Sequence, residues 1–161
     1  MKTRSIFSAL TLGVLLAAGS ILVQTAFAAE VPFQGSRVTV ESSKSFDEVK
    51  KALKSMVAKN DMMVMAEVDQ GNLLSMTGYK VKAHLFLIGN PTVGKKLFEQ
   101  DHAVSLYVPL RVSVYVDAND KTIVEYDKPS ALLSQFEGEK VGMVAQMLDQ
   151  KIGALAKMAA Q

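Results

Sequence analysis

The sequence contains no cysteine, and this absence excludes several kinds of chemistry at once. Disulfide bonds, thiolate metal sites and thiol nucleophiles all need that side chain. Stability must therefore come from an ordinary hydrophobic core, which the many valine, leucine, isoleucine, methionine and alanine residues can supply. We also expect no lipid-modified amino terminus, because no cysteine follows the first apolar run.

That apolar run has the pattern of a cleaved export signal. Lys2 and Arg4 precede an apolar stretch at 6–23, and Ala26-Phe27-Ala28 is typical of a signal-peptidase site. We expect residues 1–28 to be removed, residues 29–36 to form a flexible lead-in, and the protein to be periplasmic or secreted. The alternative is an uncleaved membrane anchor, but serine, threonine and glycine residues interrupt the run.

The expected mature chain has no excess of basic charge. Of 18 lysine and arginine residues, two lie in the signal, so 16 remain against 16 aspartate and glutamate residues. Nucleic acids and anionic membrane surfaces attract proteins with a basic excess. We therefore expect no nucleic-acid partner and no membrane partner after signal cleavage.

The hydrophobic periodicity predicts a single α+β domain over residues 37–161, a mainly antiparallel sheet backed by helices in the order β-α-β-β-α-β-β-α. Ser45 and Glu48 form a capping box before the first helix. A loop at 69–78 could hold one helical turn, and Pro129 opens a short helical segment. The main elements are expected at about 37–41, 45–59, 62–68, 81–88, 90–98, 104–116, 122–126 and 139–158.

The expected strand at 104–116 has the strictest pattern in the chain. Valine or leucine occupies every even position, which indicates one face in the core and one outside it. Pro109 cannot donate to a strand ladder, so it should mark an edge, a bulge or a bend. On the outward face, Tyr107, Arg111 and Tyr115 are residue types enriched at interfaces, and a symmetric homodimer is the default geometry. The alternative is a solvated sheet face.

The segment from Gly89 to Lys96 matches part of the phosphate-binding loop G-x-x-x-x-G-K-[ST]. Lysine stands where that motif needs a hydroxyl for magnesium, and Pro91 deletes a backbone donor. A simpler interpretation is that Gly89 ends a strand, Asn90 caps a helix, Pro91 begins it and Gly94 allows close packing. Asn90, Lys95 and Lys96 remain a candidate site for weak anion binding at that helix terminus.

The same segment contributes to a family resemblance. Gly89-Asn90-Pro91, Gly94, Val108-Pro109-Leu110-Arg111 and Tyr126-Asp127-Lys128-Pro129 together resemble the domain of unknown function 302 family. The resemblance covers nearly the whole mature chain. Gly89, Asn90, Pro91, Gly94, Pro109, Tyr126 and Pro129 correspond to its motif positions, which we interpret as structural.

The resemblance implies a small domain of β-α-β(4)-α type, similar in outline to the TATA-binding-protein-like fold, and plausible dimerisation. The family has no agreed activity, so it implies no catalytic residue. Val108-Pro109 stands where the family pattern has Leu-Pro, and Gln70 follows Asp69 where many members carry Asp-His.

Methionine is abundant, and thioether sulfur is a soft ligand for Cu(I). Met63 and Met65 would share a strand face, and His84 on the next strand could approach them, so these three form a candidate copper site. The alternative is that methionine fills irregular gaps in the core. No cofactor is otherwise implied.

Catalytic patterns are scarce. His84 and His102 make no recognisable catalytic pair, and no Ser-His-Asp order or histidine-rich zinc spacing is present. His102 follows a helix end, where a cation would complement the helix dipole. The best interpretation is an exported, non-catalytic binding or accessory protein for an unknown small ligand or protein. A Cu(I) carrier and an unrecognised small enzyme are the alternatives.

Overall fold

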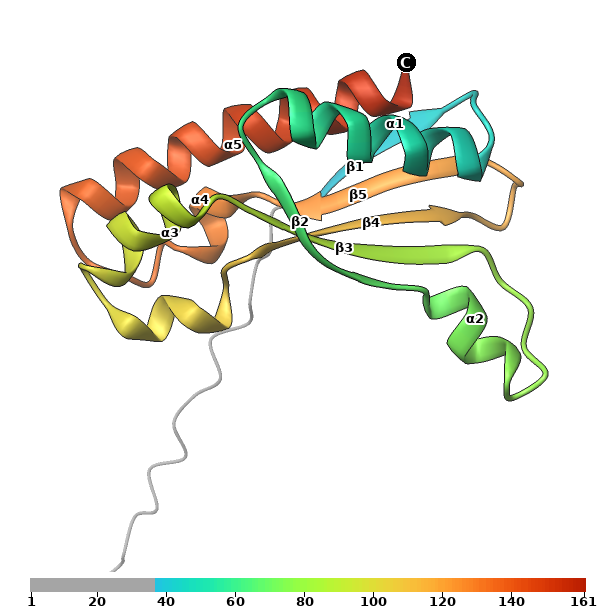
Figure 1. Cartoon of the computed structure of the whole chain (residues 1–161), viewed down its shortest axis with the longest axis horizontal. Helices are drawn as coiled ribbons and strands as arrows, with labels where there is room; N and C mark the ends of the chain where they lie inside the picture. The colour runs from blue at the N-terminus through green and yellow to red at the C-terminus, as the bar shows by residue number, and fades with distance from the viewer. Residues whose placement is uncertain (1–36) are drawn as a thin grey trace, which may run out of the picture. The chain divides into compact units, whose positions relative to one another are not determined.

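The computed structural model describes residues 37–161, which form one α+β domain (Figure 1). The predicted signal peptide and lead-in, residues 1–36, lie outside the described residues. The elements are β1 Arg37–Ser42, α1 Phe46–Lys59, β2 Met63–Val68, α2 Gln70–Ser75, β3 Ala83–Gly89, α3 Pro91–Phe98, the 3-10 helix η1 His102–Leu106, β4 Leu110–Val116, β5 Thr122–Asp127, α4 Pro129–Leu132 and α5 Glu139–Ala160.

Five strands form one antiparallel sheet in the order β1-β5-β4-β3-β2. The β2–β3–β4–β5 run is a meander, and β1 pairs with β5 on the far side, so β1 and β2 are the two edges. The predicted antiparallel α+β architecture is confirmed. None of the described helices is long and apolar enough to cross a membrane.

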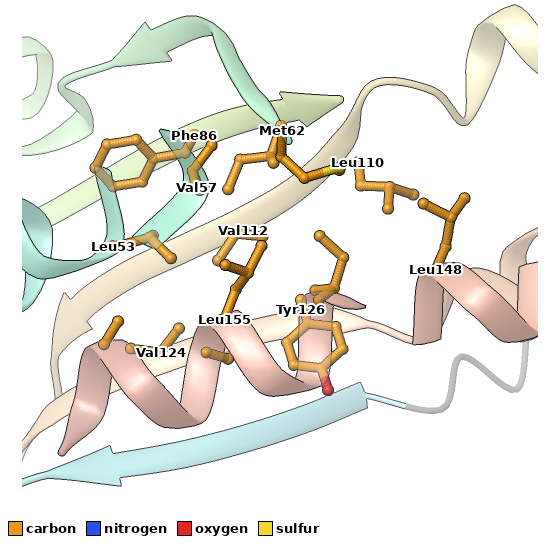
Figure 2. Packing of buried hydrophobic residues seen from close by; sticks show 14 of the residues in the cluster. Leu53, Val57, Met62, Phe86, Leu110, Val112, Val124, Tyr126, Leu148 and Leu155 are labelled. Atoms are coloured by element: carbon orange, nitrogen blue, oxygen red, sulfur yellow. The ribbon is translucent and has the colours of Figure 1, made fainter. Parts of the chain in front are cut away.

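The core lies between one face of the sheet and the helices α1 and α5 (Figure 1). Strand alternation places Phe86 and Val112 on that face, where both are almost fully buried. Leu53 of α1 and Leu155 of α5 belong to the same buried cluster and lie on the helix side of it (Figure 2). The 22-residue helix α5 runs beside α1 and also contacts α3 and α4, so it covers most of the length of the sheet.

The cap signals in the sequence act as expected. The Ser45 side chain accepts from the backbone N–H of Glu48, whose carboxylate accepts from the N–H of Ser45, so the capping box before α1 is confirmed. After α1, Asp61 adopts a positive φ of 54° and the chain turns into β2.

The prediction of one strand across 104–116 is wrong for residues 104–109. Asp101 accepts from the N–H of Ala103 and starts the short helix η1, and the strand begins only at Leu110, after the Val108–Pro109 bond. Alternation also fails there, because Val104 is buried while Leu106 is 80% exposed. Three apolar residues at every second position, 104, 106 and 108, are too few to distinguish a strand from a 3-10 turn.

The segment between β2 and β3 holds the short helix α2, as the sequence allowed. Asp69 caps it by accepting from the N–H of Asn72. In Figure 1, α2 and the loop after it extend away from the sheet on the side opposite α1 and α5. Its apolar side chains are largely exposed, among them Leu73 and Met76.

Candidate functional site

A hollow of about 340 Å³ opens between the end of β3, helix α3 and the start of β4. Five of the seven family-motif positions line it, namely Gly89, Asn90, Pro91, Gly94 and Pro109. Hydrophobic residues that span 86 positions of the sequence complete the wall, including Met62, Ile88, Leu97, Phe98, Leu110 and Leu148. Figure 2 shows Leu110 and Leu148 at one end of the packed cluster, with Met62 next to Leu110.

Asn90 fixes the geometry of this hollow. Its Oδ1 accepts from the backbone N–H groups of Thr92 and Val93, at 2.8 and 3.1 Å, which caps α3. Its Nδ2 donates to the backbone carbonyl of Asp61 at 2.6 Å, which ties the start of α3 to the turn between α1 and β2. One side chain therefore joins the end of β3, the start of α3 and the turn that leads into β2.

Gly89 lies between two hydrophobic side chains of the wall. A Cβ at this position would be 2.9 Å from Cε and 3.2 Å from Sδ of Met65, and 3.5 Å from Cβ of Pro109. Met65 reaches this place because β2 shifts register between Val64 and Ala66, so Met65 lies in a β-bulge. The glycine lets both neighbours approach the end of the strand closely.

Gly94 has a different role from the one expected. We predicted that it allows close packing, but an added Cβ would have no heavy atom within 4 Å. This prediction is wrong, because the residue stands in open space at the wall of the hollow rather than against a neighbouring element. A larger side chain at position 94 has room to extend over the cavity.

Polar groups are few in the wall. The oxygen and the nitrogen of the Asn90 amide both bind backbone partners. Lys95 is the charged side chain among the lining residues. Lys95 is exposed and pairs with Glu99 at 3.7 Å, one turn along α3. No titratable pair converges on the hollow, so its wall offers neither a general acid and base nor an activated nucleophile.

The candidate anion site does not form at the start of α3. Pro91 has no N–H, the N–H groups of Thr92 and Val93 bind Asn90 Oδ1, and the N–H of Gly94 binds the Asn90 carbonyl. Every donor of the first turn is occupied, so no backbone cradle for phosphate exists here. Of the two lysines, Lys95 lines the hollow, whereas Lys96 faces a separate depression beside α5.

The candidate copper ligands are not brought together. Met63 lies opposite Gly89 on β3, five residues from His84, a separation of about 17 Å along the strand. An odd spacing also puts the two positions on opposite faces of the sheet. His84 is buried, while Met63 and Met65 are about half exposed. Among residues 37–161, no group of three or more histidine, aspartate or glutamate side chains is placed to hold a metal ion.

His84 instead belongs to a polar chain that joins the sheet to α1. Its Nε2 lies 3.1 Å from Glu67 Oε2, and Glu67 Oε1 accepts from Lys54 at 2.7 Å. The hydrogen bond from Lys54 holds the pKa of Glu67 below its usual range, with a smaller contribution from His84. The ring also lies against Phe86 at a tilt of 39°, with 4.7 Å between the ring centroids. These contacts fix a buried histidine within the fold.

The predicted interface residues do not share one face. Arg111 and Tyr115 lie on β4 and point away from the helices, and the hydroxyl of Tyr115 donates to Glu125 at 3.2 Å. Burial, with help from Glu125, raises the pKa of Tyr115. Tyr107, in contrast, follows η1 and packs edge-on against Phe136 at 5.7 Å. The strand predicted for 104–109 does not form, so Tyr107 leaves that face.

The last two motif positions lie away from the hollow. Tyr126 of β5 is buried under α5, with its hydroxyl 3.1 Å from where a Cβ on Gly153 would be, and burial raises its pKa. Pro129 opens α4, where Ser130 donates from both its N–H and its hydroxyl to Asp149 of α5. Both positions fix α5 to the sheet, which agrees with a structural role.

Sequence reasoning missed most of the wall. Met62, Phe98, Val108 and Leu148 line the hollow, but each reads in the sequence as an ordinary core residue. In the sequence, only the motif residues Gly89, Asn90, Pro91, Gly94 and Pro109 are distinctive in this part of the chain, and their pattern predicts turns and not a cavity.

Comparisons with known proteins add a family and a fold. The family described as "Domain of unknown function DUF302" matches residues 38–159. A solved structure, an uncharacterized conserved protein of the DUF302 type from Bacillus stearothermophilus, is similar with a TM-score of 0.71 at 16% sequence identity. The match covers 78% of this chain and 98% of that one, and at this identity it shows the fold alone. A search of curated proteins finds no match.

Proposed function

Because the chain belongs to the DUF302 family, whose description names no activity, we propose a function from the hollow itself: a non-catalytic protein that binds a small apolar molecule. The observation that carries this proposal is the composition of the wall. Hydrophobic side chains from β2, β3, α3, β4 and α5 converge on a preformed cavity, and its polar side chains are one lysine and one amide with three backbone hydrogen bonds.

The size of the hollow agrees with a ligand of modest size. Small-molecule sites usually occupy about 300–1,000 Å³, so 340 Å³ lies at the lower end of that range. An apolar cavity of about 150 Å³ can hold benzene. A cavity about twice as large fits two fused rings or a hydrocarbon chain of about ten carbons.

Binding without catalysis is supported by what the wall lacks. Enzyme sites bring together titratable groups whose pKa values are shifted by burial or by one another. In the described domain, the groups with shifted pKa values are Glu48, Glu67, Tyr115, Asp117 and Tyr126, and none of them lines the hollow. An unrecognised enzyme is therefore the weaker alternative.

A fluorescent probe tests the proposal directly. N-phenyl-1-naphthylamine is neutral and becomes bright in apolar surroundings. Its two fused rings match the size of the hollow, and its phenyl ring can extend through the open side, so we expect saturable binding to the mature protein. Gly94→Leu should abolish this binding by filling the hollow, while raising the free energy of unfolding by about 0.5–1 kcal/mol because glycine is a poor helix former.

The matched control is Gly142→Leu in α5. Gly142 also has no neighbour within 4 Å of an added Cβ, but it does not line the hollow. This variant should gain stability and keep probe binding. If Gly94→Leu remains folded and binds the probe as well as the unaltered protein does, the hollow is not the binding site.

We further propose that this binding takes place outside the cytoplasm. The support is the sequence pattern of residues 1–28 alone. Sequencing the amino terminus of protein recovered from the periplasm or medium tests it, and a chain that still begins at Met1 would contradict it.

Self-association through the uncovered sheet face stays a prediction. Arg111 and Tyr115 lie on that face, and α2 lies on the same side of the sheet (Figure 1). The α2 region carries the exposed apolar side chains of Leu73 and Met76. Light scattering of the mature protein over a range of concentrations tests it. Arg111→Glu should shift the equilibrium towards the monomer, and a concentration-independent monomer would refute it.

A further inference from the structure

The electrostatics of the hollow point to a more specific ligand. We propose that it holds an anionic amphiphile, with a hydrocarbon tail of about ten carbons in the cavity and a carboxylate or phosphate head at Lys95. This inference rests on the proposed function, because it names the chemical class of the molecule in that same cavity.

The tail follows from the wall of the cavity. Ile88, Leu97 and Leu110 are almost fully buried and give the hollow an apolar floor. The amide of Asn90 already binds three backbone partners, so it can offer a polar group of the ligand one N–H of Nδ2 and no more. Elsewhere in the cavity a polar group of the ligand would lose its water without gaining a hydrogen bond from a side chain, which is costly. The polar end of the ligand therefore stays at the rim.

The rim has one charged side chain, and it is a cation. Lys95 projects from α3 beside Gly94, and its ammonium group lies 3.7 Å from Glu99 in an exposed ion pair. An exposed pair of this kind is weak, so a ligand carboxylate can replace Glu99 as the partner of Lys95 at little cost. A cationic head would instead meet the ammonium group of Lys95 directly.

The expected preference for an anionic over a neutral head group is modest. An exposed ion pair contributes about 0.2–1 kcal/mol, which corresponds to a change in affinity of about 1.4- to 5-fold. Glu99 has the opposite effect, since it competes for Lys95 and repels an anion. Removing the charge of Lys95 should therefore weaken anion binding, and removing the charge of Glu99 should strengthen it by a similar factor.

Displacement of the neutral probe N-phenyl-1-naphthylamine from the mature protein tests this. Decanoate and decanol share a tail and differ in the charge of the head, so the ratio of their affinities isolates the contribution of the anion. We expect Lys95→Gln to lower the decanoate-to-decanol ratio about 1.4- to 5-fold and Glu99→Gln to raise it similarly. Both effects should fade in 1 M salt, where the Debye length is about 3 Å. Decyl phosphate in parallel assigns the head group.

Lys96→Gln is the matched control. Lys96 is the next residue of α3, carries the same charge and faces a different depression, so this variant should change the ratio less than Lys95→Gln does. Equal effects of the two substitutions, or no effect of either, would overturn the assignment of the head group while leaving the proposed function intact. Absence of probe binding to the unaltered protein would instead refute the proposed function.

Discussion

The side chain of Asn90 carries the local architecture of the hollow, and its replacement by alanine tests that account. The substitution removes two hydrogen bonds that cap α3 and one to the carbonyl of Asp61. Loss of an asparagine N-cap costs about 1 kcal/mol, and loss of a further hydrogen bond about 1 kcal/mol. We therefore expect Asn90→Ala to lower the free energy of unfolding by about 2 kcal/mol.

Two further substitutions separate the contributions. Serine and aspartate are good N-caps, so Asn90→Ser and Asn90→Asp keep the cap and lose the donor to Asp61. Each should cost about 1 kcal/mol, half the effect of alanine. The assay is urea denaturation followed by far-ultraviolet circular dichroism, with the same slope for all variants if the unfolded states are alike.

An asparagine in an exposed turn serves as the control. The Asn119 side chain makes one long hydrogen bond of 3.4 Å to Asp117, so Asn119→Ala should cost less than about 0.5 kcal/mol. The reasoning is refuted if Asn90→Ala costs no more than this control, or if Asn90→Asp is as stable as the unaltered protein. Either result would mean that the contact with Asp61 does not hold α3 against the turn.

Three other substitutions test the packing and the charges elsewhere. Gly153→Ala should give no gain in stability, since its Cβ would lie 3.1 Å from the hydroxyl of buried Tyr126. Gly142→Ala has open space around the added Cβ, so it should raise the free energy of unfolding by about 0.5–1 kcal/mol, measured by thermal denaturation. A similar gain at both sites would refute the contact between position 153 and Tyr126. The lowered pKa of Glu67 stabilises the fold above about pH 4.3, and this stabilisation is lost as the pH falls through that lowered pKa. Glu67→Gln should therefore lower the free energy of unfolding at pH 7 by up to about 1 kcal/mol, a small value because the carboxylate is a third exposed. At pH 3 the loss should be smaller. An equal loss at both pH values would contradict this account. Asp149→Ala removes two hydrogen bonds at the start of α4 and should cost about 1–2 kcal/mol in urea, while an unchanged midpoint would show that this contact contributes nothing.

Local signals in the sequence predicted the local structure well. The capping box before α1 and the Asn90-Pro91 start of α3 are each decided by atoms within a few residues, and both are confirmed. Alternation likewise located the true part of β4, and β5 lies at the predicted position of the next strand. These features depend on short-range hydrogen bonds and on which face of an element is apolar, and the sequence carries both.

The hollow could not be predicted because it depends on strand register and helix placement. Its wall combines β2, β3, α3, β4 and α5, and no local pattern states which ends of these elements meet. The candidate copper site failed for the same reason. Adjacent strands were expected to bring Met63 near His84, but the register places Met63 opposite Gly89 instead.

The β-bulge at Met65 has a consequence beyond the cavity. Strand β2 is an edge of the sheet, and an unpaired edge is a template on which another chain can add a strand and begin to aggregate. The extra residue breaks the regular row of free N–H and C=O groups along that edge. The irregularity that brings a methionine against Gly89 thus also makes β2 a poor starting point for fibril growth.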